Sequence, residues 1–200
     1  MKKIMSVLLA VLMFGMFTFP NNTAKASERS EQVDLGTLLT PEIEKEINEN
    51  MPEVSLENPV STYVASNGLT VVDELEMTPA MEYNAAVVPM ADSFSSKLYV
   101  NHKKTFYASG FSIATFKGRW LCTFWRDGSV TINKWDYFLV GINDGTATNK
   151  STEIRSSGKP AKARGYVTLN ARFFSGDVLW NVNVNSPSSV SSTVTVTRGE

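Results

Sequence analysis

Alternating apolar and polar residues dominate the second half of the chain. Small or apolar residues occupy every second position of 161–173, and valine or tryptophan largely alternates with asparagine in 178–185. Such alternation is typical of β-strands with one buried and one exposed face. Further strands are expected at Lys97–Asn101, Thr105–Phe116, Arg119–Trp125, Ser129–Val140, Thr193–Thr197 and, more weakly, Thr148–Arg155.

These strands number about eight, and each needs a cover for its apolar face. Two antiparallel sheets packed face to face bury all such faces together. We therefore expect residues 91–200 to form an antiparallel β-sandwich, with a closed β-barrel as the alternative.

Two dipeptides predict β-hairpins. Asn67-Gly68 lies between apolar runs at 63–66 and 69–72, and Asp127-Gly128 lies between two longer runs; both dipeptides favour two-residue loops. In the second hairpin such a loop fixes the register and aligns an aromatic pair and an opposite-charge pair, each worth roughly 0.2–1 kcal/mol. The predicted pairs are Trp125–Val130, Trp120–Trp135 and Arg119–Asp136.

A short helix is expected before the first hairpin. Thr40 is a good N-cap, Pro41 suits the first helical position, and Pro52 ends the helix. Ile43 and Ile47 share one face. A helix of about ten residues does not persist alone in water, so we expect this face to pack against the rest of the protein. The stretch 78–95 has the composition of a linker.

The N-terminus has the pattern of a signal peptide. Lys2 and Lys3 precede a mostly apolar run at 4–19, and Ala24-Lys25-Ala26 fits a signal peptidase site. The pattern, which is typical of bacteria, predicts a secreted protein cleaved near Ala26–Ser27. An uncleaved N-terminal anchor is the alternative.

Charge divides the remainder of the chain into two parts. Residues 27–90 hold thirteen acidic and two basic residues, whereas residues 91–200 hold fourteen basic and seven acidic ones. Such asymmetry suggests an electrostatic partner for each part. The acidic segment 27–90 is therefore interpreted as a pro-region that masks the basic domain until it is removed, or as a poorly ordered solubilising extension.

Few residues suit catalysis, because the chain has one histidine and one cysteine. Cys122 is expected in the middle of a strand as a buried packing residue. His102 precedes two lysines in an expected turn and is interpreted as a solvated loop residue. With no Gly-x-Ser-x-Gly motif and too few metal ligands, neither a Ser/His/Asp triad, a Cys/His pair nor a zinc site is predicted.

The carboxylates of the basic domain do not form an obvious catalytic pair. Turn formation accounts for three aspartates and cross-strand pairing for a fourth, which leaves Glu153 without the second acid that glycosidases need. The Asn-Asp-Gly-Thr turn at 143–146 offers oxygen ligands for calcium, but such turns are common without metal. No phosphate loop or dinucleotide motif occurs. We therefore expect no cofactor, no metal and no enzymatic activity.

A row of polar and basic side chains on one predicted strand is the best candidate for a binding face, although an ordinary solvated strand face has the same pattern. The row consists of Lys162, Arg164, Tyr166, Thr168, Asn170 and Arg172.

The leading hypothesis is a secreted, non-enzymatic β-sandwich that binds an anionic cell-envelope component or another extracellular partner. A positive surface outside the cell attracts an anionic cell-wall polymer, a membrane surface or an acidic protein. Nucleic acid is not expected as the natural partner of an exported protein. The alternatives are an antimicrobial or toxin-like protein masked by its acidic segment, and an extracellular hydrolase of unfamiliar design.

Overall fold

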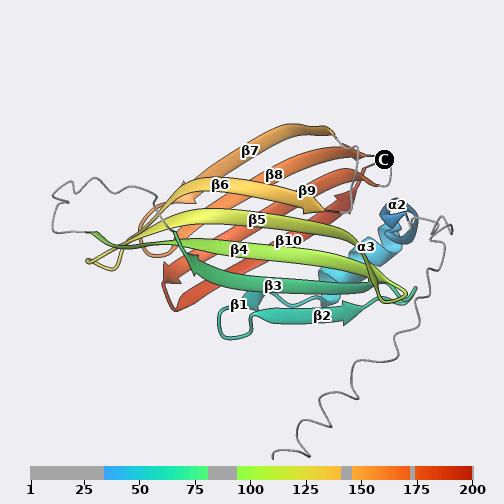
Figure 1. The fold of residues 1–200 in the computed structure, drawn as a ribbon, viewed down its shortest axis with the longest axis horizontal. Coiled ribbons are helices and arrows are strands. Elements are labelled where there is room, and N and C mark those ends of the chain that lie inside the picture. Colours follow the sequence, from blue (N-terminus) through green and yellow to red (C-terminus); the bar gives the residue numbers. More distant parts are fainter. Residues whose placement is uncertain (1–33, 81–93, 141–145, 172–173, 200) are drawn as a thin grey trace, which may run out of the picture. The chain divides into compact units, whose positions relative to one another are not determined.

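The computed structural model describes residues 34–80, 94–140, 146–171 and 174–199 (Figure 1). Two five-stranded sheets pack face to face, and all neighbouring strands are antiparallel. This confirms the predicted β-sandwich. The first sheet has the order β1 (Val54–Ser55), β10 (Ser189–Arg198), β9 (Phe174–Ser186), β8 (Ala161–Ala171), β7 (Thr146–Ser156). The second has the order β2 (Val60–Val64), β3 (Thr70–Pro79), β4 (Phe94–Ala108), β5 (Phe111–Trp125), β6 (Val130–Val140).

The alternating pattern produces the sandwich because each strand turns its apolar side inward. In β8 and β9 buried residues alternate strictly with more exposed ones. Tryptophan rings of each sheet lie directly against glycines of the other: Trp180 against Gly118, and Trp135 against Gly165. A glycine inside a strand commonly marks such a close approach. The largest fully buried side chains are Trp120, Trp180, Phe106, Phe116 and Phe174.

Among the described residues, two helices precede the strands, α2 (Leu35–Leu38) and α3 (Pro41–Asn50). As predicted, the Thr40 side chain caps α3 by accepting a hydrogen bond from the Ile43 N–H at 3.4 Å. Ile43 and Ile47 are buried, and the helix packs against β10. This packing supplies the tertiary support that a ten-residue helix requires.

The acidic segment contributes directly to the sheets. Its strand β3 pairs with β4 over ten residues, and β1 pairs with β10. The boundary expected at residues 90–91 lies outside the described residues, but the parts that it would separate share one sheet. Acids of the first part form ion pairs with bases of the second: Glu74 with Lys103, Glu76 with Lys117, and Asp73 with Lys104.

Both predicted hairpins form, but each has a three-residue loop. Trp125 N–H donates to the Ser129 carbonyl at 3.0 Å, and the Ala65 N–H donates to the Leu69 carbonyl at 2.9 Å. The last loop residue is a glycine with positive φ, 81° at Gly128 and 84° at Gly68. This geometry is the usual alternative to a two-residue loop, and the Asn-Gly or Asp-Gly signal does not distinguish the two.

The longer loop changes one predicted pair and leaves the others intact. Val130 faces Phe124 rather than Trp125, so the first predicted pair is wrong. A β-bulge between Leu121 and Cys122 then shifts the register by one residue. The pairs Trp120–Trp135 and Arg119–Asp136 form as predicted.

The predicted turn at His102 is wrong, because β4 runs without interruption through this position. The chain instead reverses at Ser109-Gly110, inside the expected strand Thr105–Phe116. Both turn residues have positive φ, 51° and 82°, as a type I′ hairpin turn requires. Two lysines after a histidine resemble a polar turn in sequence, whereas they are strand residues here.

Candidate functional site

A groove opens on one side of the sandwich, between the edge strands β6 and β7. Strand β6 is the last strand of the second sheet and β7 the last of the first. The second sheet ends before it covers β7, so side chains on the inner face of β7 remain exposed, including Lys150, Thr152 and Ile154. The groove has a volume of about 630 Å³, within the range typical of ligand sites. It is lined by Arg119, Lys134, Trp135, Asp136, Tyr137, Lys150 and Thr152.

A β-bulge in β7 decides which side chains face this groove. Thr148 lies opposite Thr168, but after the bulge Lys150 lies opposite Val167, a fully buried residue of the core face. Without the extra residue, position 149 would face inward and Lys150 outward. Bulges often re-aim side chains beside functional sites. The bulge therefore places a lysine on the inner face of a sandwich.

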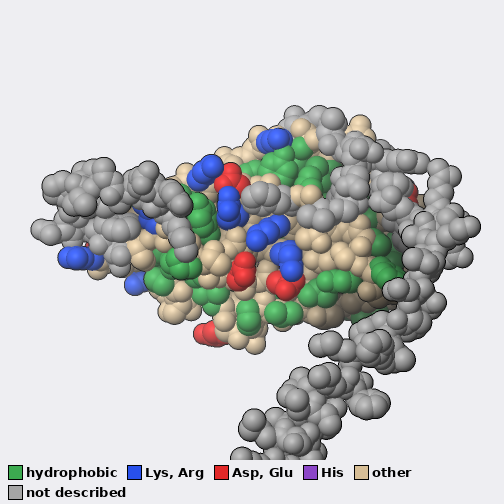
Figure 2. Space-filling view, viewed as in Figure 1, with side chains coloured by type: hydrophobic (Ala, Val, Ile, Leu, Met, Phe, Trp, Pro, Cys, Tyr) green, Lys and Arg blue, Asp and Glu red, His purple; other side chains and the backbone are tan. Residues whose placement is uncertain are grey.

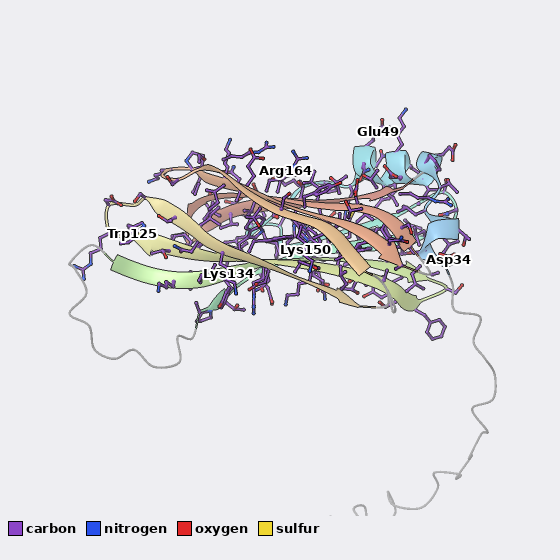
Figure 3. All side chains as sticks on the ribbon, turned by 90° about the horizontal axis from the view of Figure 1, so that it is seen from above. Asp34, Glu49, Trp125, Lys134, Lys150 and Arg164 are labelled. Atoms are coloured by element: carbon purple, nitrogen blue, oxygen red, sulfur yellow. The ribbon has the colours of Figure 1, made fainter. Side chains whose placement is uncertain are left out.

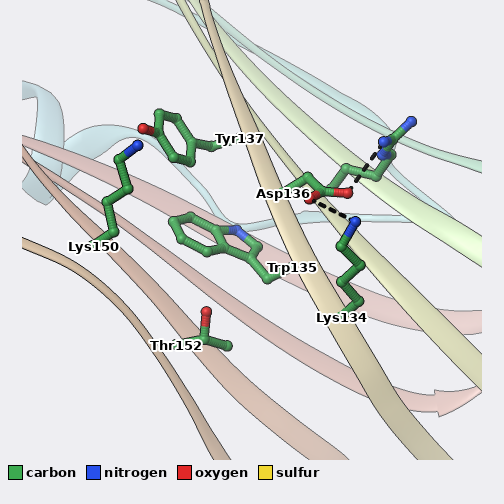
Figure 4. A pocket seen from close by; sticks show the side chains of 7 residues that line it. Lys134, Trp135, Asp136, Tyr137, Lys150 and Thr152 are labelled. Atoms are coloured by element: carbon green, nitrogen blue, oxygen red, sulfur yellow. Dashed lines mark hydrogen bonds and ion pairs between the residues drawn. The ribbon is translucent and has the colours of Figure 1, made fainter. Parts of the chain in front are cut away.

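The groove has an aromatic floor formed by Trp135 and Tyr137. Their rings are stacked with centroids 5.4 Å apart, and the Trp135 ring rests on Gly165. The Lys150 Nζ lies 5.1 Å from the centroid of the Tyr137 ring, a cation–π contact (Figure 4). The indole N–H of Trp135 has no hydrogen-bond partner among the described residues.

Two further cations at the groove share one carboxylate. Lys134 Nζ and Arg119 Nη2 each lie 3.2 Å from Asp136 (Figure 4). Burial alone would raise the pKa of the Asp136 carboxyl, but hydrogen bonds from Lys134 and Arg119, with their charges, hold the pKa below its ordinary value. Three cations against one ionised acid leave the lining with a net charge of +2. The groove therefore suits a ligand that combines a ring with a negative charge.

The charged rim of the groove continues across the outer face of the second sheet. There, basic side chains lie beside acidic ones in the middle of the face, between hydrophobic patches (Figure 2). The ion pairs of this face are Lys103–Glu74, Lys117–Glu76, Arg119–Asp136 and Lys134–Asp136. Most cations of this face are thus paired with an acid. Lys150, which lies on the inner face of β7, has no paired acid among the described residues.

The predicted row on β8 lies on the opposite face of the first sheet from the groove. In Figure 3, Arg164 lies on the outer side of the first sheet, while Lys150 lies between the sheets. Lys162 and Asn170 are exposed. Arg164, Tyr166 and Thr168 are half-buried, and the Thr168 hydroxyl donates to the Tyr166 oxygen at 3.1 Å. Arg172 lies outside the described residues. A binding role for this row stays a prediction.

A second polar cluster is buried between the sheets, on the side covered by α3. His102 Nδ1 lies 2.7 Å from the Ser192 hydroxyl, and His102 Nε2 lies 3.3 Å from Asp73. Lys104 Nζ also lies 3.3 Å from Asp73 and donates to the Val194 carbonyl. The side chains of His102, Asp73 and Lys104 are at most 5 % exposed, and Ser192 is 1 % exposed. The interpretation of His102 as a solvated residue is therefore wrong.

Hydrogen-bond directions argue against a nucleophilic Ser192. Its hydroxyl donates its proton to the Asn181 carbonyl at 2.6 Å. The hydroxyl must therefore accept from His102 Nδ1–H, which leaves the imidazole no lone pair toward the serine to act as a base. The cluster is also closed to solvent, because Ser192 is 1 % exposed and His102 is 0 % exposed. Its geometry is that of a buried structural network, in which the facing atoms His102 Nε2 and Asp73 Oδ1 approach to 3.3 Å without a hydrogen bond.

Burial raises the pKa of the Cys122 thiol to about 12. Cys122 is completely buried, so its predicted role as a packing residue is confirmed. Within the described residues no group of three or more His, Cys, Asp or Glu side chains is arranged to hold a metal ion.

Comparison with known proteins gives no family for this chain. No protein-family model, no curated protein and no solved structure matches it. Among the described helices, none has the length and apolar character needed to cross a membrane.

Proposed function

We propose that this protein is exported and binds an anionic cell-wall polymer in the groove between β6 and β7, without catalysing a reaction. The observation that carries the proposal is the position of Lys150, which a β-bulge turns onto the inner face above Tyr137. A lysine held beside half-buried aromatic rings offers a charge and an apolar surface at one point. No acid among the described residues is paired with Lys150, so its charge is available to a ligand.

The groove suits one repeat of an anionic sugar polymer. The faces of Trp135 and Tyr137 favour contact with the flat, less polar side of a ring. The net positive charge of the lining favours a phosphate or carboxylate substituent on the ligand. Thr152 adds a hydroxyl that both donates and accepts hydrogen bonds.

Export is supported by the N-terminal sequence. A basic start, an apolar run and Ala24-Lys25-Ala26 together fit a secretory signal. Outside the cell, an anionic wall polymer would attract the positively charged groove and concentrate the protein at the wall.

A binding role is favoured over catalysis by the state of the candidate catalytic groups. The Ser192 proton is donated to a backbone carbonyl, and burial raises the pKa of Cys122. At the groove itself, Asp136 is the single acid in the lining and is engaged by two cations. Acid–base hydrolysis of a glycoside needs two carboxyl groups.

The masking alternative requires a large rearrangement. To release the basic domain, β3 would have to leave β4, and Asp73 would have to leave Lys104 and His102. Removing one partner of a buried ion pair typically costs about 3–5 kcal/mol. The pairing therefore favours an acidic segment that stays with the sandwich.

The test uses the protein purified from culture medium, with its N-terminus determined. It is mixed with isolated cell walls, and retention is measured over a series of salt concentrations. We expect retention to fall as the salt concentration rises. Retention should also fall when anionic polymers are extracted from the walls. Retention that is unchanged by both treatments would overturn the proposal, as would preferential binding to anionic lipid vesicles or to an acidic protein in parallel assays.

A further inference from the structure

The edge strand β2 lacks the features that protect most sheet edges. Its five residues, Val60 to Val64, carry no charge, and the side chains of Val60 and Val64 are 59 % and 60 % exposed. In Figure 1, β2 forms the border of the second sheet with β3 as its neighbour. An exposed apolar edge strand is a ready template for pairing with another chain.

The register shows which backbone groups face this edge. The Ala65 N–H donates to the Leu69 carbonyl, and the Leu75 N–H donates to the Pro59 carbonyl. Hydrogen-bonded positions alternate along an antiparallel strand, so residues 59, 61, 63 and 65 bond to β3. Residues 60, 62 and 64 therefore direct their N–H and C=O groups toward the free edge.

One edge strand of the first sheet, β7, is very different. Strand β7 carries Lys150, Glu153 and Arg155, and two bulges interrupt its register. Charges and bulges are the usual means by which proteins prevent edge-to-edge association. Charges and bulges thus protect the edge at β7, whereas the edge at β2 is suited to pairing.

We propose that β2 pairs with β2 of a second copy of this chain, in antiparallel register about a twofold axis at Thr62. The sequence Val-Ser-Thr-Tyr-Val is nearly symmetric about Thr62. Antiparallel pairing therefore places Val60 opposite Val64 of the partner subunit, and Thr62 opposite Thr62 of the partner subunit. Pairs of β-branched residues and of threonines are favourable neighbours across strands, and the same patch serves both subunits, as a twofold interface requires.

Charge also favours a second copy over a charged peptide. The strand has no charge to repel itself, and the nearest acid on the outer face, Glu74, is already paired with Lys103. Five residues a side form a small interface, well under the roughly 1,200 Å² of stable complexes. The dimer is therefore weak and concentration-dependent, and the pairing joins the two second sheets into one.

The first test measures sedimentation of the full secreted protein over a range of concentrations. We expect the wild type to shift from monomer toward dimer as concentration rises. Thr62→Pro removes an N–H that faces the free edge and leaves the bonds to β3 intact, so this variant should remain monomeric with an unchanged melting temperature. A wild type that is monomeric throughout, or a folded Thr62→Pro variant that associates equally, would overturn the proposal. Should Thr62→Pro unfold, Val64→Lys tests the same edge through its side chain.

The second test is cross-linking through Thr62→Cys. Directly opposed strand residues have Cα atoms about 5.5 Å apart, which suits a disulfide. The native Cys122 is buried and does not compete. We expect rapid formation of a covalent dimer under oxidation, whereas Thr197→Cys, exposed on the first sheet, should cross-link at the slower rate of random collision. Equal rates for the two variants would contradict the proposal. Neither test involves the groove, so its outcome is independent of the proposed function.

Discussion

The two sides of this sandwich place charged and aromatic groups in opposite ways. On the covered side, where α3 packs against β10, the charges of Asp73 and Lys104 are sealed between the sheets. On the open side, between β6 and β7, the rings of Trp135 and Tyr137 face a groove. Charges are usually outside and aromatic rings inside, so both sides depart from the common arrangement, each for a different reason.

On the covered side the buried charges of Asp73 and Lys104 are paired with each other. Asp73 lies within 3.3 Å of both Lys104 and His102, and Ser192 links the histidine to a strand of the other sheet. Leu39 and Ile47 of the helical region border the same small space as Lys104. Among the described residues, no helix covers the open side and no acid is paired with Lys150. This difference is the basis for proposing a structural role for the covered side and a binding role for the groove.

The largest expected effect is the loss of Asp73. In Asp73→Ala, Lys104 remains buried without its counter-charge, so the free energy of unfolding should fall by about 3–5 kcal/mol. Glu74→Ala, the neighbour that faces outward to the half-exposed Lys103, should cost at most about 1 kcal/mol. Urea unfolding of both variants measures the contrast. Equal losses would show that the covered cluster is not a structural network.

Variants at the two tryptophan–glycine contacts allow effects on stability to be distinguished from effects on binding. An added Cβ at Gly165 would lie 2.3 Å from the Trp135 ring, and one at Gly118 would lie 2.6 Å from Trp180. Gly165→Ala and Gly118→Ala should therefore each lower stability by about 1–3 kcal/mol through overpacking. Gly165→Ala displaces the Trp135 ring of the floor directly, whereas Gly118→Ala acts on it only through the contact of Trp180 with Trp135. Gly165→Ala should therefore weaken retention on cell walls more than Gly118→Ala. A Gly165→Ala variant that folds and is retained on cell walls like the wild type would show that the floor does not take part in binding.

A smaller effect concerns alkaline pH on the covered side. Burial lowers the pKa of Lys104 below 10.5, against the opposing charge of Asp73. Between the folded pKa and 10.5 the unfolded chain binds more protons than the folded one, so this group's contribution to stability increases as pH rises. The difference in unfolding free energy between wild type and Lys104→Met should increase over this interval, with Lys103→Met as the baseline. A difference that is flat or that decreases would contradict the assigned environment.

Sequence patterning was sufficient for the sandwich and for part of the covered side. Alternation identified the faces of β8 and β9, and the Thr40 cap identified α3. His102 was misplaced because its lysine neighbours suggested a turn. Val100 and Phe106 lie an even number of positions from His102 along the strand, and both are buried. This alternation is the signal that would have placed His102 inside. The identity of its partners needed the fold, since Ser192 lies 90 residues away.

The groove was much harder to predict from sequence. Its central lysine faces inward only because of a bulge, and no residue type in Thr146–Ser156 marks where that bulge falls. The close approach of Trp135 to Gly165 depends on how the two sheets are aligned. Cross-strand alignment within one sheet did identify the Trp120–Trp135 pair, because a hairpin register is a local property.

Two lysines on adjacent strands give the most direct test of where ligand binds. Lys150 faces the groove, and Lys162 lies on the outer face in the predicted row of β8; both are exposed, so Lys150→Ala and Lys162→Ala remove equal charge at little cost in stability. Affinity for the extracted anionic wall polymer is measured by titration calorimetry at one salt concentration. We predict a loss of about tenfold, or roughly 1.4 kcal/mol, for Lys150→Ala and less than about twofold for Lys162→Ala. Equal losses, or a larger loss for Lys162→Ala, would contradict the assignment of binding to the groove.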